Sequence, residues 1–299
     1  MISPRSSAAK APRAILAGIA LMLFGCLLSA GMSTLAKAMM FAFPLMQVLL
    51  VRNLTAAAVC APFAIGPLLN MPRPWLQLFR FALCAAEAPM YLYAISQLPL
   101  VDVMTFYMAG PIYVTVLSAT LLGETVRWRR WSAVLVGFLG VLIALRPSSA
   151  MLTASALIAL TGSVLYAGVL TTTRMLRGTP NVVLMMTQIS GPLVYALIAG
   201  LQNWTEPSLT DLVLMCSLGL GSVVTTGCIS RSLALAPASI VVPYQYALIV
   251  GGALFGYLFF GERPDVTTLI GAAIIIGAGV YIFTRELKVA PRPPVVEAP

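Results

Sequence analysis

The chain has 299 residues, of which 60% are hydrophobic and 9% are charged, and its net charge is +9. Soluble domains carry about 25% charged residues, so this composition excludes a soluble protein and indicates one that spans a membrane. The sequence contains no histidine, and its five cysteines show no C-x-x-C spacing, so we expect neither a metal site nor a cofactor held by these residues.

Ten apolar runs approach or reach the length of about 20 residues that a helix needs to cross the hydrocarbon core of a bilayer. Because these runs are continuous and lack two-residue alternation, they favour helices over a transmembrane β-barrel. In chain order the predicted spans are 14–36, 45–66, 75–96, 101–122, 131–147, 151–173, 181–201, 210–232, 238–260 and 266–284. The predicted fold class is all-α and integral to the membrane, with ten transmembrane helices and short tails at 1–13 and 286–299.

The first predicted helix, 14–36, follows three basic residues, as the apolar stretch of a signal peptide does. It is long enough to span a bilayer, and it matches helix 151–173 in an internal repeat, so we expect the helix to be retained. Lys37 at the end of the first helix has an equivalent in Arg174 at the end of the sixth. Both side chains are expected to anchor helix ends at the membrane interface.

The second and third predicted helices contain ionisable residues, which are costly inside a membrane and therefore indicate function. Glu87, near the middle of the third helix, is predicted to bind a substrate or to take a proton, and it is the candidate for coupling. The alternative is a structural ion pair with Arg52 of the second helix. Arg52 offers a planar fork for a substrate carboxylate, unless it extends to the outer interface. Gln47, five residues before Arg52, is a further candidate for substrate binding.

Aromatic residues occupy matched places in the two halves of the chain. Phe106-Tyr107 in the fourth predicted helix aligns with Tyr244-Gln245 in the ninth at an offset of 138 residues, and Tyr246 follows. Tyr91 lies on the third helix. Tyrosines at this interface suit a flat or cationic organic ligand, through stacking and cation–π contact. The alternative is a belt of tyrosines at the membrane surface.

The sequence repeats itself at an offset of 138 residues. Leu98-Pro99 is followed 25 residues after its proline by Gly123-Glu124, and Ala236-Pro237 is followed at the same interval by Gly261-Glu262. Each Gly-Glu pair is expected to cap a helix end, with its carboxylate bonded to a neighbouring loop. A membrane chain built from two similar halves is typical of a transporter with its binding site between the halves.

Five predicted spans in each half is an odd number, so the second repeat, 148–285, is expected to lie upside down relative to the first, 14–147. With a cytoplasmic N-terminus, 14 of the 18 Lys and Arg residues lie on the cytoplasmic side. This bias predicts a bacterial inner-membrane protein with both termini in the cytoplasm. The same bias explains the net positive charge, because basic residues on the cytoplasmic side face anionic lipid. We therefore expect no nucleic-acid partner.

Two further patterns limit the functional classes. The sequence lacks the phosphate-binding motif G-x-x-x-x-G-K-[ST] and has no histidine to activate a nucleophile, which argues against ATP-driven transport by this chain and against an enzyme. Gly137 and Gly140 in the fifth predicted helix, with Gly271, Gly277 and Gly279 in the tenth, permit close helix packing within the chain or in a homodimer.

This pattern resembles the drug/metabolite transporter superfamily, EamA-type, in its ten spans, its Leu/Ala-Pro before the fourth helix of each half and its Gly-Glu after it. The resemblance covers about residues 14–285 and implies alternating access around a central cavity, lined by the first four helices of each half. Helices five and ten are then expected outside the lining. The stretch with Lys37, Pro44-Leu45-Met46-Gln47 and Arg52-Asn53 is similar to a subgroup of riboflavin and S-adenosylmethionine permeases and metallophore exporters.

These observations lead us to expect an inner-membrane secondary transporter that exports a small zwitterionic or aromatic metabolite, such as an amino-acid derivative or a metallophore. A proton or a counter-substrate is expected to drive it. The alternative within the same class is an uptake permease for riboflavin or S-adenosylmethionine. The alternative from another class is a membrane scaffold or sensor, in which Glu87 and Arg52 only hold helices together.

Overall fold

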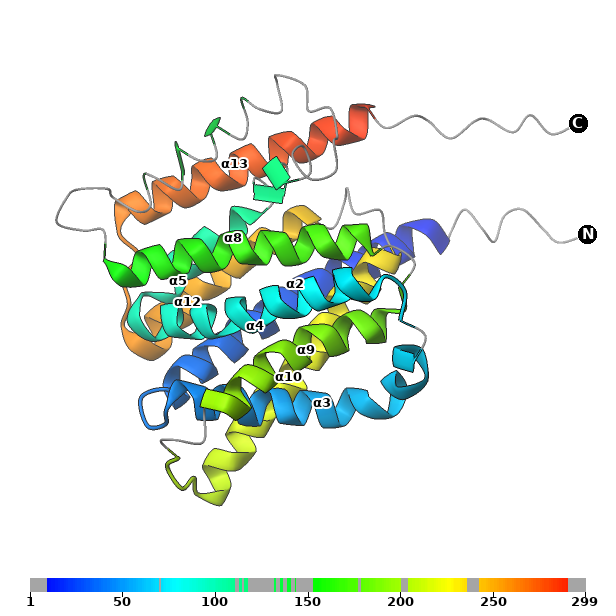
Figure 1. Ribbon diagram of the computed structural model, residues 1–299. Helices are drawn as coiled ribbons and strands as arrows, with labels where there is room; N and C mark the ends of the chain where they lie inside the picture. The colour runs from blue at the N-terminus through cyan, green and yellow to red at the C-terminus, as the bar shows by residue number, and fades with distance from the viewer. Residues whose placement is uncertain are drawn as a thin grey trace, which may run out of the picture.

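The computed structural model describes residues 10–69, 71–110, 153–176, 179–199, 204–235 and 242–289, with isolated positions between 113 and 143. Within these ranges the regular elements are helices, and they contain no strand. They are α2 (Lys10–Met39), α3 (Leu45–Leu69), α4 (Pro74–Gln97), α5 (Leu100–Met108), α8 (Ala154–Met175), α9 (Asn181–Ala199), α10 (Leu209–Leu235), the 3₁₀ helix η1 (Val242–Tyr246), α12 (Ala247–Phe260) and α13 (Val266–Val289) (Figure 1).

Six of the described helices, α2, α3, α4, α8, α9 and α10, are long and apolar enough to cross a membrane. Two shorter apolar helices lie at Tyr244–Phe260 and Val266–Ala278. These elements confirm the predicted all-helical fold class and lie at the predicted spans. The predicted helix 131–147 and the second half of 101–122 lie mostly outside the described residues.

Proline and glycine set several helix ends. α4 begins with Pro74 at its first position, where the missing backbone N–H costs nothing. It ends at Gln97 because Leu98, which precedes a proline, adopts an extended backbone with φ −118° and ψ 159°. α12 ends at Phe260, because the next residue, Gly261, has a φ of 66°, the left-handed conformation of a helix C-cap. Within α4 the helix continues through Pro89.

The helices of the two halves interlock, and their contacts follow a two-fold relation. The most extensive packing joins α2 to α10 and α4 to α8. In both contacts, which form an equivalent pair, the first helix of one half packs on the third helix of the other half. α3 with α10 and α4 with α9 form a second such pair, and α2 with α12 and α5 with α8 form a third. This pairing is the spatial form of the sequence repeat.

Glycines permit the close approach of helices in one of these equivalent pairs. A Cβ atom at Gly219 of α10 would collide with the backbone carbonyl oxygen of Arg52 on α3. A Cβ atom at Gly191 of α9 would lie 2.9 Å from the backbone nitrogen of Ala85 on α4. The two glycines therefore position the backbones of α3 and α4, the helices that carry Arg52 and Glu87.

The largest buried apolar cluster draws on both halves, with Leu49, Leu92 and Leu100 from the first half and Met215 and Ile275 from the second among the most buried side chains. Gly140 of the fifth predicted helix packs on α13, since a Cβ atom there would lie 2.9 Å from Ile274. At Gly140 the glycine pattern thus serves packing within the chain, and a homodimer stays a prediction.

Candidate functional site

A cavity of about 260 Å³ lies where the two halves meet. Its lining comes from α2, α3, α4 and α5 of the first half and from α8, α9, α10 and α12 of the second. No α13 residue is among the described residues that line it. The arrangement agrees with a central cavity lined by the first four helices of each half.

Two charged side chains face this cavity among the residues that the structure describes, Arg52 from α3 and Glu87 from α4. The two side chains attract each other electrostatically. They nevertheless form no ion pair, and within the described ranges the ion pair that does form joins Lys37 to Glu262. The structural ion pair between Arg52 and Glu87 that we considered is therefore wrong for this conformation, and both charges remain available to a ligand.

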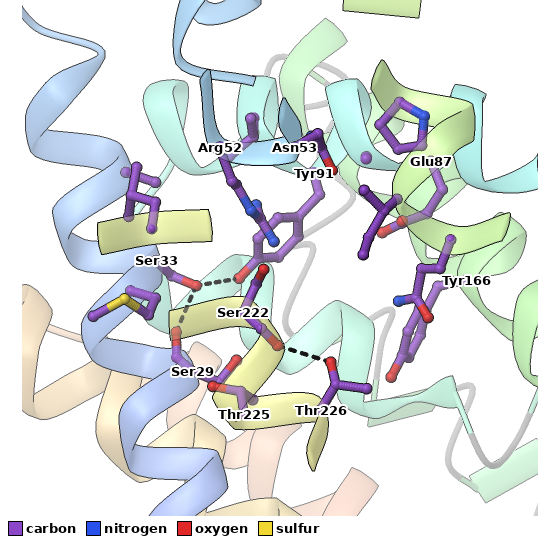
Figure 2. A pocket seen from close by; sticks show the side chains of 18 of the residues that line it. Ser29, Ser33, Arg52, Asn53, Glu87, Tyr91, Tyr166, Ser222, Thr225 and Thr226 are labelled. Carbon is purple, nitrogen blue, oxygen red and sulfur yellow. Dashed lines mark hydrogen bonds between the residues drawn. The ribbon is translucent and has the colours of Figure 1, made fainter. Parts of the chain in front are cut away.

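Arg52 and Glu87 lie on different sides of the cavity in Figure 2, with Tyr91 beside Arg52 and Tyr166 beside Glu87. Figure 2 also shows no hydrogen bond from Arg52 to the residues drawn. A cation and a carboxylate separated in this way match the two charges of a zwitterion, because each charged end of the ligand would meet an opposite charge.

Three tyrosines form an aromatic wall next to these charges. The rings of Tyr91 and Tyr107 meet edge to face at 4.9 Å between centroids, and Tyr107 lies 5.6 Å from Tyr166. The Tyr91 hydroxyl is hydrogen-bonded to that of Ser33 on α2 at 2.7 Å. Such a wall can pack against the apolar or aromatic body of a ligand.

The structure brings together four of the eight predicted binding residues: Arg52, Glu87, Tyr91 and Tyr107 all line the cavity. Gln47 does not, because its fully buried amide exchanges hydrogen bonds of 2.6 and 3.0 Å with the backbone of Thr205, ahead of α10.

The other three predicted residues lie in η1, which contributes no described residue to the cavity lining. Tyr246 is buried in the core, Gln245 is half-buried and Tyr244 is exposed.

Sequence reasoning missed several lining residues of the second half, including Tyr166 on α8, Gln188 on α9 and Thr225 on α10. The repeat contains a signal for one of them. Thr225 is equivalent to the candidate Glu87 at the 138-residue offset, and both residues line the cavity. Tyr166 is equivalent to Ser29 at the 137-residue offset, but Ser29 was not itself a candidate.

Lys37 and Glu262 link the two halves at one end of the bundle. The Lys37 ammonium group is buried, pairs with Glu262 and donates a hydrogen bond of 2.6 Å to the carbonyl oxygen of Leu98. The second carboxylate oxygen of Glu262 accepts the backbone N–H of Leu100 at 2.9 Å. The expected interfacial anchoring of Lys37 is therefore wrong, because its partner is a buried carboxylate. The Glu262 carboxylate accepts its bond from Leu100, the first residue of α5, whereas we expected it to bond to a neighbouring loop.

The equivalent pair in the other repeat, Glu124 and the side chain of Arg174, lies outside the described residues.

Comparison with known proteins places this architecture in a family. A model of the EamA-like transporter family matches residues 16–146 and 153–285. An S-adenosylmethionine uptake transporter of Rickettsia bellii is 25% identical, over 81% of this chain and 84% of its own. A riboflavin transporter of Rhizobium johnstonii is 28% identical over 72% of each chain. A pseudopaline exporter of Pseudomonas aeruginosa is 28% identical, over 64% of this chain and 69% of its own.

One solved crystal structure matches 94% of this chain and 99% of its own, with a TM-score of 0.57 and 18% sequence identity. At that identity the match shows a shared fold. The cavity, the interlocked halves and the family match therefore agree on a multi-pass membrane protein that carries small molecules.

Proposed function

This chain belongs to the EamA-like transporter family, and on that premise we propose that it exports a small zwitterionic metabolite across the bacterial inner membrane by alternating access. The observation that carries the proposal is the separation of Arg52 from Glu87 in one cavity. Arg52 holds the carboxylate of the substrate, and Glu87 holds its ammonium group or takes a proton in exchange. The tyrosine wall packs on the organic body.

The size of the cavity supports a small cargo. Its volume of about 260 Å³ lies below the roughly 300–1,000 Å³ of pockets that hold drug-sized ligands. An amino-acid derivative or a short metallophore fits this scale and carries both charges. Export is supported by the pseudopaline exporter among the relatives.

The second candidate is an uptake permease for S-adenosylmethionine or riboflavin, and the names of two relatives favour it. S-adenosylmethionine has an amino-acid end that Arg52 and Glu87 would receive equally well. A scaffold or sensor without transport has less support, because it requires Arg52 and Glu87 to be paired and they are not.

Comparative metabolomics of a deletion strain, cells against medium, tests both cargo and direction. Export predicts that one zwitterionic compound accumulates inside the deletion strain and that the wild-type gene restores its release. Accumulation in the medium with depletion in the cells would instead support uptake. Identical profiles in the two strains, under conditions where the gene is expressed, would contradict transport.

The role of Glu87 is tested by Glu87→Gln, with Glu206→Gln as the matched control because Glu206 is exposed and lies outside the cavity. We expect Glu87→Gln to abolish the dependence of transport on the pH gradient while the protein reaches the membrane at its normal level. Glu206→Gln should behave as the wild type. Unchanged, gradient-dependent transport by Glu87→Gln would refute this assignment.

A further inference from the structure

Arg80 of α4 is an arginine that the positive-inside count treats only as an orientation charge, yet it is buried, with 2% of its surface exposed. Its Nη1 donates to the carbonyl oxygen of Leu184 at 2.8 Å and to the hydroxyl of Thr187 at 2.6 Å, both on α9. Its Nε donates to the hydroxyl of Thr173 on α8 at 3.1 Å. The guanidinium therefore lies between three helices rather than at the membrane surface.

The partners of Arg80 within the described ranges are all neutral. This differs from Lys37, whose charge is balanced by Glu262. The last turn of α8, which contains Thr173, gives partial compensation because the C-terminal end of a helix dipole favours a cation. A buried cation without a carboxylate nevertheless leaves a positive potential in its surroundings.

Gln188 connects this charge to the cavity. Nη2 of Arg80 donates to Oε1 of Gln188 at 3.3 Å, and Gln188 itself lines the cavity. Because a guanidinium only donates hydrogen bonds, the amide oxygen of Gln188 has to face Arg80. The amide NH₂ group is thereby turned away from Arg80, which leaves its two donors free of the guanidinium on a side chain that lines the cavity.

The resulting site has more positive charge than negative. The described groups are Arg52 and Glu87 in the cavity wall and Arg80 directly behind Gln188. Seven residues, or about 10 Å of helix rise, separate Arg80 from Glu87 on α4. If a zwitterionic head group satisfies Arg52 and Glu87, the amide of Gln188 and the charge of Arg80 still lack an anionic partner among the residues that the structure describes.

We propose that Gln188, oriented by Arg80, forms an anion-accepting subsite, and that the cargo carries a second acidic group in addition to its zwitterionic head. This inference rests on the proposed function, because it assumes that Arg52 and Glu87 hold the head group. Gln188 contacts the acidic group directly, and Arg80 is the positioning residue that sets the orientation of the amide and supplies the field.

The subsite gives an order of preference among candidate cargoes. An acidic amino-acid derivative, such as a polycarboxylate metal chelator, is favoured. A neutral amide of the same shape binds less tightly. S-adenosylmethionine, which carries a sulfonium in addition to its ammonium and carboxylate, is disfavoured by the same field.

The test uses the purified full chain in lipid nanodiscs and measures binding of L-glutamate and L-glutamine, which have almost the same shape but differ by one charge. At about 10 Å and an effective dielectric constant near 20, the interaction with Arg80 corresponds to roughly a tenfold preference for L-glutamate. Equal affinity for the two amino acids would overturn the subsite and leave the zwitterion site intact. Binding of neither amino acid would contradict both the subsite and the proposed head-group site.

Two variants and a control isolate the subsite. Gln188→Glu should fold, because the new carboxylate faces Arg80, and it should reverse the preference toward L-glutamine. Arg80→Gln should remove the preference while L-glutamine still binds. Arg73→Gln is the control, because Arg73 also donates to a carbonyl oxygen of α8 but is exposed. A Gln188→Glu protein with the wild-type preference for L-glutamate would overturn the inference, since loss of packing alone does not reverse a charge preference.

Discussion

The link between Lys37 and Glu262 makes a quantitative prediction about stability. Lys37→Met removes one member of a buried pair and leaves the Glu262 carboxylate uncompensated, which typically costs about 3–5 kcal/mol. Glu262→Gln should cost less, about 1–3 kcal/mol, because an amide oxygen can still accept the backbone N–H of Leu100.

The two changes together should cost less than the sum of the single changes, because the double variant buries no unpaired charge. Equilibrium unfolding in mixed micelles, followed by circular dichroism, measures each free energy of unfolding. Arg263→Gln, next to Glu262 but exposed, is the control and should stay within about 0.5 kcal/mol of the wild type. A Lys37→Met protein as stable as this control, or full additivity in the double variant, would refute the reasoning.

Three further predictions concern packing and hydrogen bonds. Gly219→Val should lower both stability and transport because its side chain displaces the backbone at Arg52, whereas Gly227→Ala, with open space around it, should have neither effect in the same unfolding and transport assays. Gln47→Leu should cost about 1–3 kcal/mol of unfolding free energy, because it breaks both bonds to the backbone ahead of α10. Tyr91→Phe keeps the ring and loses only its bond to α2, so it should lower stability by about 1 kcal/mol and leave the maximal transport rate within about twofold.

The fold was predictable because the bilayer imposes it. Span length, continuous apolar runs and the 138-residue offset determine the helices and the internal repeat, and none of these depends on side-chain contacts. The helix ends at Gln97 and Phe260 follow from the proline and the glycine that come after them. The packing of α2 on α10 is equivalent to the packing of α8 on α4, as expected when two equivalent halves pack on each other with two-fold symmetry.

The charged part of the site was predictable because charged residues are costly in a membrane, and Tyr91 and Tyr107 were found from the aromatic pattern. Glu87 and Arg52 are conspicuous in the sequence because burying a charge inside a transmembrane helix is energetically costly and usually indicates a function. Gln47 has the same appearance in sequence, but a backbone partner far along the chain satisfies its amide. Lys37 was assigned to the interface because its partner is distant in sequence. Which polar residue finds a partner is decided by tertiary packing, which a single sequence does not display.

The central claim is that the charges of the cavity bind the cargo during transport. Its most direct test measures the ratio of intracellular to extracellular metabolite in a deletion strain complemented with the wild type, Arg52→Gln or Arg73→Gln, at matched amounts of protein in the membrane. The wild type and Arg73→Gln should restore the ratio, because Arg73 is exposed and outside the cavity, and Arg52→Gln should leave it at the level of the deletion strain. Full restoration by Arg52→Gln would contradict the account.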